Sequence, residues 1–343
     1  MAARIDAIPM TTIRISTPEE IAARAGEQTP FVRLPERGAV FAERELRLRQ
    51  LAAGHAMRDF LIFLADLAQA QQRVLNEGLK LAVPDAHELD GAAAAGAPPL
   101  PATDWPRPAL WRNALARLVA AMRERAGPGA AAQTLARLAS AGDDWLEQQA
   151  DRLLHGVMLG LDLGAAPLIA AALQVVWTEL VLQTQALHGA REPAPFGRIA
   201  DAGACPGCGS RPTASVIRID GQHSGQRYLH CSLCSLQWHR PRIQCSRCGS
   251  TEKIHYQALA PEPGHAASAT GAAAGSVKAE CCDDCGHYLK IVYMDKDAHA
   301  DPVADDLASV TLDLLVAETG LQRHGVNLLL LFGDPEAAPP EPG

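Results

Sequence analysis

Apolar residues recur at helical spacing along the first half of the chain. From Arg37 to Gly78, spacings of three, four and seven residues predict one long helix. The expected apolar face of this helix consists of Leu48, Leu51, Phe60, Leu61, Leu64 and Leu67. Thr17, followed by Pro18 and by Glu20, is typical of a helix start. Further helices are expected at about Ala109–Arg125, Ala130–Ser140, Asp143–Gly156 and Pro167–His188.

After Ile199 the pattern changes to short runs of β-prone residues between cysteine pairs. Asp220-Gly221 lies between two such runs and predicts a hairpin turn. Strands are expected at Ala214–Asp220, Gln226–His230, Leu236–Arg240 and His287–Met294. A last amphipathic helix is expected to begin at Asp301-Pro302 and to end at Gly320. Its expected buried residues are Leu307, Val310, Leu314 and Val316.

These patterns predict an α+β protein in two parts. Residues 1–195 are expected to form an α-helical domain, interrupted by a flexible linker at about 91–101. Residues 199–300 are expected to form a small, β-rich, rubredoxin-like or zinc-ribbon-like domain. Its two modules span about 203–240 and 241–295, with a mobile insert at 260–276. A C-terminal helix at 301–320 and a disordered tail at 334–343 complete the expected order.

Composition and charge narrow the function classes. The 343 residues are 48% hydrophobic but only 4% aromatic, which favours helices packed through aliphatic side chains. The net charge of -8 does not favour nucleic-acid binding, although Arg198–Lys253 has a local excess of Lys and Arg. No secretory signal is visible, so a cytoplasmic protein is expected. Gly164–Leu182 is about as long as a membrane span, but its Gln174, Thr178 and Glu179 favour a buried helix.

The nine cysteines all lie between Cys205 and Cys285, and eight of them form four CxxC pairs. The pairs are Cys205/Cys208, Cys231/Cys234, Cys245/Cys248 and Cys282/Cys285. Two intervening residues let one tight turn aim both sulfur atoms at a common point, while backbone N–H groups of the turn donate to the thiolates. The residue after the second cysteine often needs a positive φ, and it is Gly in three pairs and Ser in the fourth.

Four such pairs match two tetrahedral four-thiolate sites, each for one zinc or iron ion. Sequential pairing puts the first two CxxC pairs in one site and the last two in the other, whereas interleaved pairing would need the chain to cross between the sites. Structural disulfides are not expected in a chain without an export signal. A dithiol oxidoreductase would need one such motif rather than four. Iron would make a site redox-active, and zinc would make it structural only.

Other residues near the pairs are weaker candidates. Cys281 could compete with Cys282 through its spacing to Cys285, but the tight CxxC geometry favours Cys282 as the ligand. Ordinary hydrogen-bonding roles are expected for His223, His230 and His239, because eight cysteines are available. Trp238 is expected to cover a metal-binding turn rather than to stack on a base. The local arginines are expected to offset the charge of about -2 on a divalent metal with four thiolates.

Five segments carry a family likeness: Cys205–Pro212, Arg227–His239, Cys245–Gly249, Cys282–Tyr293 and Asp301–Ser309. In this order they resemble the bacterial formate dehydrogenase accessory protein family, FdhE, and a weaker likeness covers Leu51–Gln71. The resemblance implies a non-catalytic cytoplasmic factor that acts on the molybdenum-containing catalytic subunit of formate dehydrogenase before export. It also implies a helical domain followed by rubredoxin-like modules, in which the eight paired cysteines bind iron. Cys281, the alanine-rich linker and the insert depart from the family pattern.

Two other functions compete with this interpretation. A nucleic-acid-binding zinc ribbon would need a basic face with aromatic residues placed to stack on bases, and only the local excess of arginine supports it. A rubredoxin-like electron-transfer protein or enzyme is the second alternative. An enzyme would need a substrate or cofactor pocket, and we find no dinucleotide fingerprint, P-loop or nucleophile–base signature in the chain.

Overall fold

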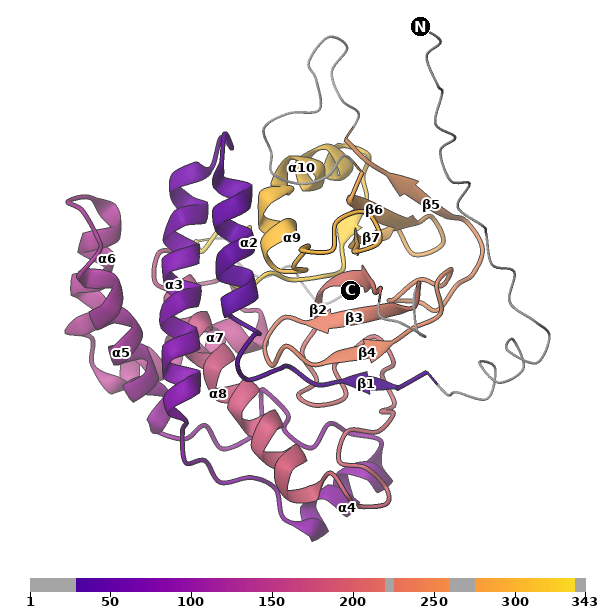
Figure 1. Cartoon of the computed structure of the whole chain (residues 1–343), viewed down its shortest axis with the longest axis horizontal. Helices are drawn as coiled ribbons and strands as arrows, with labels where there is room; N and C mark the ends of the chain where they lie inside the picture. The colour runs from indigo at the N-terminus through magenta and orange to yellow at the C-terminus, as the bar shows by residue number, and fades with distance from the viewer. Residues whose placement is uncertain (1–28, 220–224, 260–274, 337–343) are drawn as a thin grey trace, which may run out of the picture. The chain divides into compact units, whose positions relative to one another are not determined.

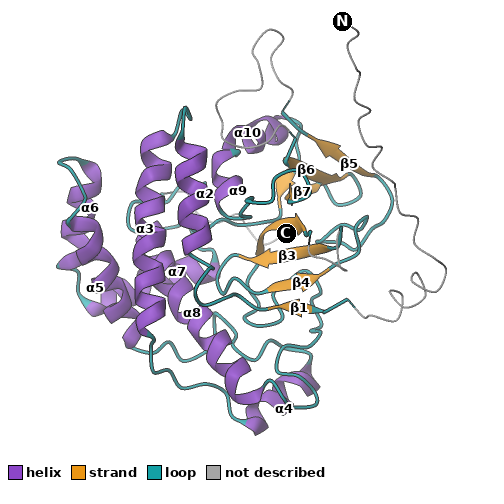
Figure 2. Cartoon of the chain, in the orientation of Figure 1, coloured by secondary structure: helices purple, strands orange, loops and turns teal. Residues whose placement is uncertain are grey.

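The computed structural model describes residues 29–219, 225–259 and 275–336, and the compact unit considered below begins at Phe31. The long helices lie on one side of this unit and the strands on the other (Figure 1 and Figure 2). The expected helix start at Thr17 lies outside the described residues, as does His223. The same holds for residues 260–274 of the expected insert and residues 337–343 of the expected tail.

The helical side is built around α8, which packs against α3, α5 and α7. The helices are α2 (Ala42–Ala52), α3 (Arg58–Glu77), α4 (Ala86–Ala95), α5 (Leu110–Arg123), α6 (Ala130–Ala139), α7 (Asp143–His155), α8 (Ala166–His188), α9 (Ala304–Ala308) and α10 (Val310–Glu318). The apolar face predicted for residues 37–78, which now lies on α2 and α3, faces the core. Its leucines are fully buried, and Phe60 is partly buried. The hydrophobic period therefore identified the packed surface correctly.

The single helix predicted from Arg37 to Gly78 is wrong, because two helices, α2 and α3, occupy this region and lie side by side (Figure 1). The chain turns at Gly54, which has a φ of 71° that glycine adopts without strain. The ring Nδ1 of His55 then accepts the backbone N–H of Met57 at 3.0 Å, at the start of α3. Apolar spacing continues through the turn, so periodicity alone did not reveal the break.

The flexible linker predicted at 91–101 is also wrong in its first half, because residues 91–95 belong to α4. Asp85 and Glu88 form a reciprocal capping box, in which each side chain accepts the other residue's backbone N–H at 2.8 Å. The alanine run that follows has high helix propensity. Gly96, with a φ of 60°, ends the helix in the left-handed conformation.

The single C-terminal helix predicted at 301–320 is divided into α9 and α10 at Ser309. The Ser309 hydroxyl donates back to the Asp305 carbonyl at 2.7 Å and so competes with the helical pattern. Because the break rotates the second helix, Leu314 is exposed rather than buried as predicted, and Leu312 is buried instead. Leu307 and Val316 are buried as expected.

The strands form one sheet with the order β1-β4-β3-β2-β7-β6-β5, and β8 pairs with β7. They are β1 (Val32–Arg33), β2 (Pro212–Ile217), β3 (Arg227–Cys231), β4 (Gln237–His239), β5 (Ile254–Gln257), β6 (Val277–Cys282), β7 (His287–Tyr293) and β8 (Gln322–Arg323). Strands β2–β4 and β5–β7 are two antiparallel meanders of the same order, joined by the parallel pair of β2 and β7. The fold therefore repeats one three-stranded unit.

The predicted strands correspond to β2, β3, β4 and β7, whereas β1, β5, β6 and β8 were not predicted. Strands β1 and β8 have two residues each and exist only through pairing with β4 and β7. Strand β6 contains the adjacent residues Cys281 and Cys282, and it lies between β5 and β7 in the sheet. Strands β1 and β8 pair with partners that are distant in sequence, so local patterns do not indicate them.

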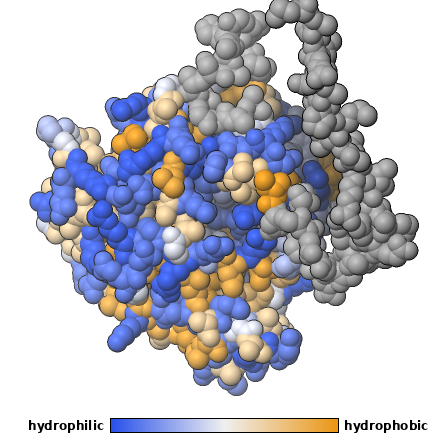
Figure 3. Space-filling model, viewed as in Figure 1, coloured by the Kyte–Doolittle hydropathy of each residue, from blue (hydrophilic) through white to orange (hydrophobic). Residues whose placement is uncertain are grey.

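Helix α8 is long and apolar enough to cross a membrane, but 83% of its most apolar window is buried inside the protein. Two of its polar residues have internal partners: Gln174 donates to the Ser232 carbonyl at 2.8 Å, and Glu179 accepts from Arg37 at 2.6 Å. The face of the molecule in Figure 3 is largely hydrophilic over the helices on its left. The burial and internal partners identify α8 as a central helix of the core, as its sequence predicted.

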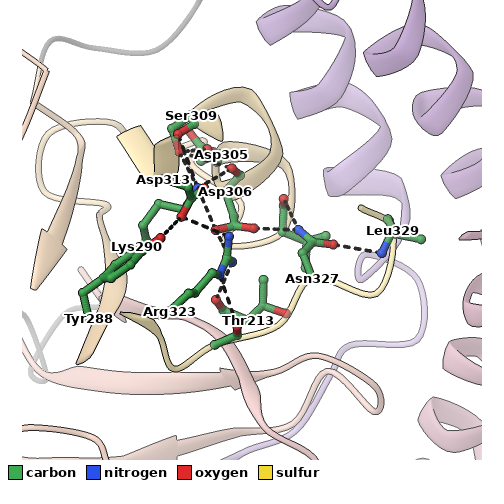
Figure 4. Close-up of polar contacts among 12 residues, drawn as sticks. Thr213, Tyr288, Lys290, Asp305, Asp306, Ser309, Asp313, Arg323, Asn327 and Leu329 are labelled. Atoms are coloured by element: carbon green, nitrogen blue, oxygen red, sulfur yellow. Dashed lines mark hydrogen bonds and ion pairs between the residues drawn. The ribbon is translucent and has the colours of Figure 1, made fainter. Parts of the chain in front are cut away.

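A buried ion network fastens α9 and α10 to the sheet (Figure 4). The fully buried Lys290 ammonium on β7 lies 2.9 Å from Asp306 and 2.5 Å from Asp313. Arg323 contacts the same two carboxylates at 2.7 and 3.1 Å. Asn327 donates to Asp306 at 2.9 Å. Two cations thus balance two carboxylates, which is the condition under which buried charges are tolerated.

Replacing Lys290 by Met should destabilise the protein by about 3–5 kcal/mol, because two buried carboxylates would then face one cation. Urea unfolding followed by circular dichroism measures this change in free energy. The double variant Lys290→Met/Asp313→Asn should recover part of the loss, because it restores the charge balance.

The exposed Lys80 provides the control for this prediction. Lys80→Met should change the free energy of unfolding by about 0.5 kcal/mol or less. Equal stability of Lys290→Met and Lys80→Met would show that the network contributes nothing to stability.

Candidate metal centres

Each centre begins with the same hydrogen-bonded turn. The N–H of Cys205 donates to the Ser210 carbonyl at 3.0 Å, and the N–H of Gly209 donates to the Cys205 carbonyl at 2.8 Å. The corresponding bonds from Cys245 to Ser250 and from Gly249 to Cys245 measure 2.8 and 3.1 Å. In both meanders the second cysteine pair then lies at the turn between the second and third strands. The centres are therefore repeats of one local design.

The residue after each CxxC pair has a positive φ, as its type predicted. The angles are 75° at Gly209, 59° at Ser235, 76° at Gly249 and 67° at Gly286. This backbone reversal turns the chain back after the second sulfur atom, and glycine accommodates it without steric cost. Ser235 is the one position of the four where a side chain is held in the left-handed region.

The cysteines gather into the two groups expected from sequential pairing, and within each group all sulfur atoms lie within 4.8 Å of one another. The groups are Cys205, Cys208, Cys231 and Cys234, and Cys245, Cys248, Cys282 and Cys285. Interleaved pairing is thereby excluded, and all nine cysteines are free thiols rather than disulfides.

The spacing of the sulfur atoms fits a tetrahedral metal ion. Four thiolates at about 2.3 Å from a metal are separated from one another by about 3.8 Å. In the second centre the Cys245–Cys285 and Cys248–Cys282 sulfur distances are both 3.7 Å. In the first centre the Cys205–Cys234 and Cys208–Cys231 distances are 3.5 and 3.4 Å. The donor set accepts zinc and iron alike.

The first centre lies inside the main hydrophobic core, and its four cysteines are fully buried. Backbone N–H groups surround the sulfur atoms: Gly207 donates to Cys205 at 3.4 Å, and Leu233 and Cys234 donate to Cys231 at the same distance. These donors were expected from the CxxC turns. They favour the thiolate form of the cysteines and hence metal binding.

The helical side holds both turns of the first centre. The N–H groups of Leu100 and Ala102 donate to the carbonyls of Gly207 and Cys208 at 3.0 and 2.9 Å. Gln174 of α8 donates to the Ser232 carbonyl in the other turn at 2.8 Å. These contacts were not predicted, because the segment that contains Leu100 was expected to be a linker. The amide of Gln174 in a largely apolar helix was the available signal.

The second centre reaches the surface. Cys248 is exposed and Cys285 is partly exposed, while Cys245 and Cys282 are buried. Charged residues border it: Lys253 lies 3.3 Å from Asp284, and the His255 ring lies 3.4 Å from Asp283. Asp284 also accepts a hydrogen bond from the Ser250 hydroxyl. A partner molecule can therefore approach the second centre but not the first.

The thiol pKa values differ between the two environments. Burial raises the pKa of Cys205 and Cys234 well above the ordinary value. At Cys208 burial is outweighed by hydrogen bonds from the other three cysteines, which lower its pKa. In the second centre a hydrogen bond from the Ser250 backbone lowers the pKa of Cys248. The first centre can hold four thiolates only with a cation among them.

The weaker candidates lie outside both thiol groups. Cys281 is buried beside Tyr288, Leu312 and Val316 in a separate small core, and burial raises its pKa to about 11. The Nδ1 atom of His230 contacts Gln237, and the His239 ring packs edge-on against Tyr228. His230 has the hydrogen-bonding role that the sequence predicted, whereas the contact shown for the His239 ring is aromatic packing.

Trp238 and Arg227, two residues that could have contributed to a base-stacking surface, are buried. Trp238 is buried, and its indole N–H donates to the Ala202 carbonyl at 3.2 Å. Arg227 is fully buried and pairs with Glu280 at 2.6 Å. It also donates to the Pro241 and Gln244 carbonyls, so its charge is balanced by a carboxylate and by backbone groups.

The protein joins a helical unit to a β-meander that occurs twice, and each meander carries one four-thiol site. This arrangement defines a metal-binding protein of the rubredoxin-like type. Sequence models of the FdhE N-terminal, central and C-terminal domains match residues 29–192, 204–242 and 243–330. The chain belongs to the FdhE family, the formate dehydrogenase accessory proteins.

Relatives and a solved structure agree with this assignment. The FdhE homologue of Edwardsiella ictaluri is 37% identical over 94% of this chain and 100% of its own length. The homologue of Serratia proteamaculans is 36% identical over 94% of this chain and 99% of its own. The crystal structure of the FdhE protein from Pseudomonas aeruginosa superposes with a TM-score of 0.71. It is 36% identical and covers 89% of this chain and 100% of its own.

Replacing cysteines in the two centres should have unequal effects on folding. Cys205→Ser/Cys208→Ser should remove one metal equivalent and destabilise the whole protein by several kcal/mol, because the first centre lies in the main core. Cys245→Ser/Cys248→Ser should also remove one equivalent, with a smaller loss of stability. Metal analysis and thermal unfolding measure the two effects.

Cys281→Ala is the matched control, because Cys281 is buried but lies outside both thiol groups. It should retain full metal content. Loss of an equivalent in this variant, or unchanged content in either double variant, would contradict the ligand assignment.

Metal release should occur in two phases, because the second centre is open to solvent and the first is closed. A chelator monitored by absorbance should remove the first equivalent at least tenfold faster than the second. The fast phase should be absent in Cys245→Ser/Cys248→Ser. A single phase of two equivalents would contradict the inferred difference in access.

Proposed function

We propose that this chain is a cytoplasmic, non-catalytic factor required for the maturation of formate dehydrogenase, and that it binds the catalytic subunit before export. The family assignment supports the accessory role. The observation that carries the proposal is the unequal exposure of the two centres, one enclosed in the core and one with Cys248 at the surface. In this proposal the helical domain ends near residue 195 and the metal-binding domain spans about 199–300.

The two centres would then have separate roles. The eight paired cysteines would hold two metal ions, and the first four would stabilise the fold, since both of their turns are fastened to the helical side. The second four would present one thiolate edge to the client. Iron would supply one-electron redox chemistry there, whereas zinc would supply only structural stability.

A client-binding surface beside the second centre is supported by exposed apolar residues. Ile243, two residues before Cys245, is 63% exposed, and Tyr256 and Leu259 are also exposed. Tyr256 lies on β5, which is the last strand on its side of the sheet order and pairs with β6. Exposed apolar side chains at a sheet edge are typical of interaction sites. The client would therefore dock where the metal centre is accessible.

Rubredoxin-like electron transfer is a second candidate function, favoured by the exposure of Cys248. It predicts that the iron-loaded protein exchanges electrons with a soluble donor at a rate that depends on the second centre. Reduction by that donor should be slowed in Cys245→Ser/Cys248→Ser. The accessory role predicts in addition a stable complex with the client.

Oxygen-free affinity purification of the tagged protein from its own host tests the proposed function. The catalytic subunit of formate dehydrogenase should co-purify with the intact protein, and Cys245→Ser/Cys248→Ser should recover at least tenfold less of it. Ile243→Glu should weaken recovery without changing metal content, because it places a charge on the proposed docking surface.

Cys281→Ala is again the control and should recover the client fully. Equal recovery of the client by Cys245→Ser/Cys248→Ser and by the intact protein would show that client binding does not depend on the second metal centre. Absence of the catalytic subunit from every preparation, or recovery of nucleic acid in its place, would remove the maturation proposal.

A further inference from the structure

A cavity of about 410 Å³ lies close to the first centre. Its walls come from the segment before α2 and from α2 itself, from β3 and β4 with the turn between them, and from residues 294–302. His230 and Ser235, which line it, flank the cysteine pair Cys231/Cys234. The volume lies within the range of small-molecule sites, about 300–1,000 Å³.

The Arg44 guanidinium lines this cavity and is only 1% exposed. Its Nε and Nη1 atoms have no hydrogen-bond acceptor among the described residues. The Oδ1 atom of Asp301 lies 3.5 Å from Nε. That oxygen already accepts the backbone N–H groups of Val303 and Ala304 at 3.0 and 2.7 Å. Arg44 is thus a buried cation with two donor atoms that lack acceptors in the described part of the chain. Burying such donors costs free energy unless a ligand accepts their hydrogen bonds.

A second unsatisfied donor faces the same cavity. His230 is 4% exposed, and its Nδ1 atom lies 3.3 Å from the side-chain amide nitrogen of Gln237. An Nδ1 atom that accepts from this amide leaves the ring proton on Nε2. The Nε2 atom has no partner among the described residues. Two buried donors from different elements therefore line one space.

The residues that line the cavity carry charges of both signs. Glu36 and Glu43 also line the cavity, but both are exposed at its rim. Arg47, a further lining residue, is paired with Asp305 at 2.6 Å and Asp297 at 2.8 Å. Arg33 and Arg218 add positive charge to the wall. Asp301 is the third carboxylate of the lining, so four arginines face three carboxylates in all. Burial lowers the pKa of Arg44 despite the nearby Asp301 carboxylate.

We propose that this cavity binds an oxyanion group, a carboxylate or a phosphate, carried by a small organic molecule. Arg44 would donate from Nη1 to one oxygen atom of either group, while Nε stays beside Asp301. His230 would donate from Nε2. The organic part would contact apolar lining residues, which include Leu34, Val40 and Met294. Nothing in the proposed maturation role requires this site.

Calorimetric titration of the metal-loaded full chain with inorganic phosphate, and separately with acetate, tests the proposal at constant ionic strength. At least one of the two anions should bind and raise the melting temperature. Tighter binding of phosphate would identify a phosphoryl ligand, and tighter binding of acetate would identify a carboxylate ligand. The absence of binding by both anions at tens of millimolar would overturn the proposal.

Arg44→Met should weaken anion binding about 10- to 100-fold, because a charged donor is lost. Its melting temperature without anion should change little, because Nε and Nη1 have no hydrogen-bond acceptor among the described residues and Asp301 keeps its two backbone donors. His230→Gln should weaken binding by about tenfold and provides the readout if Arg44→Met does not fold. Arg49→Gln is the matched control, because Arg49 is on the same helix but pairs with Glu45 and Asp66 away from the cavity. Unchanged affinity in both Arg44→Met and His230→Gln would overturn the assignment.

Discussion

The helical side and the first cysteine centre hold each other in place. Leu100 and Ala102 bond to one cysteine turn, Gln174 bonds to the other, and the four cysteines pack among the leucines of the main core. Four buried thiolates are stable there only around a cation, since burial opposes their ionisation. The metal site, the docking of α8 and the start of the sheet are therefore one cooperative structure.

The second centre has the same CxxC turns as the first, but it lies at the surface of the protein. Its meander is joined to the first through the parallel pair of β2 and β7, and α9 and α10 are fastened to it by the ions around Lys290. Cys248 nevertheless remains at the surface. One local design thus appears twice, once as part of the core and once as an accessible site. This division is consistent with the accessory role proposed above, in which the second centre faces the client.

Much of the candidate site could be predicted because CxxC chemistry is local. The turn, its backbone donors and the positive φ at Gly209, Ser235, Gly249 and Gly286 all follow from residues within one short loop. The apolar period likewise identified the leucines that face the core. Predictions failed at Gly54 and Ser309, where apolar spacing continued through a break in the helix. They failed also at residues 91–95, where a capping box started a helix in an alanine-rich run.

The sequence by itself determined the four CxxC pairs, the helical and β-rich parts, and the family resemblance. These depend on residue type and spacing within single turns and helices. Only the tertiary structure decided which centre is buried, that the segment at Leu100 supports a cysteine turn, and that Arg44 and His230 share a cavity. Burial and the pairing of donors depend on residues from distant parts of the chain, and no local pattern encodes those neighbours.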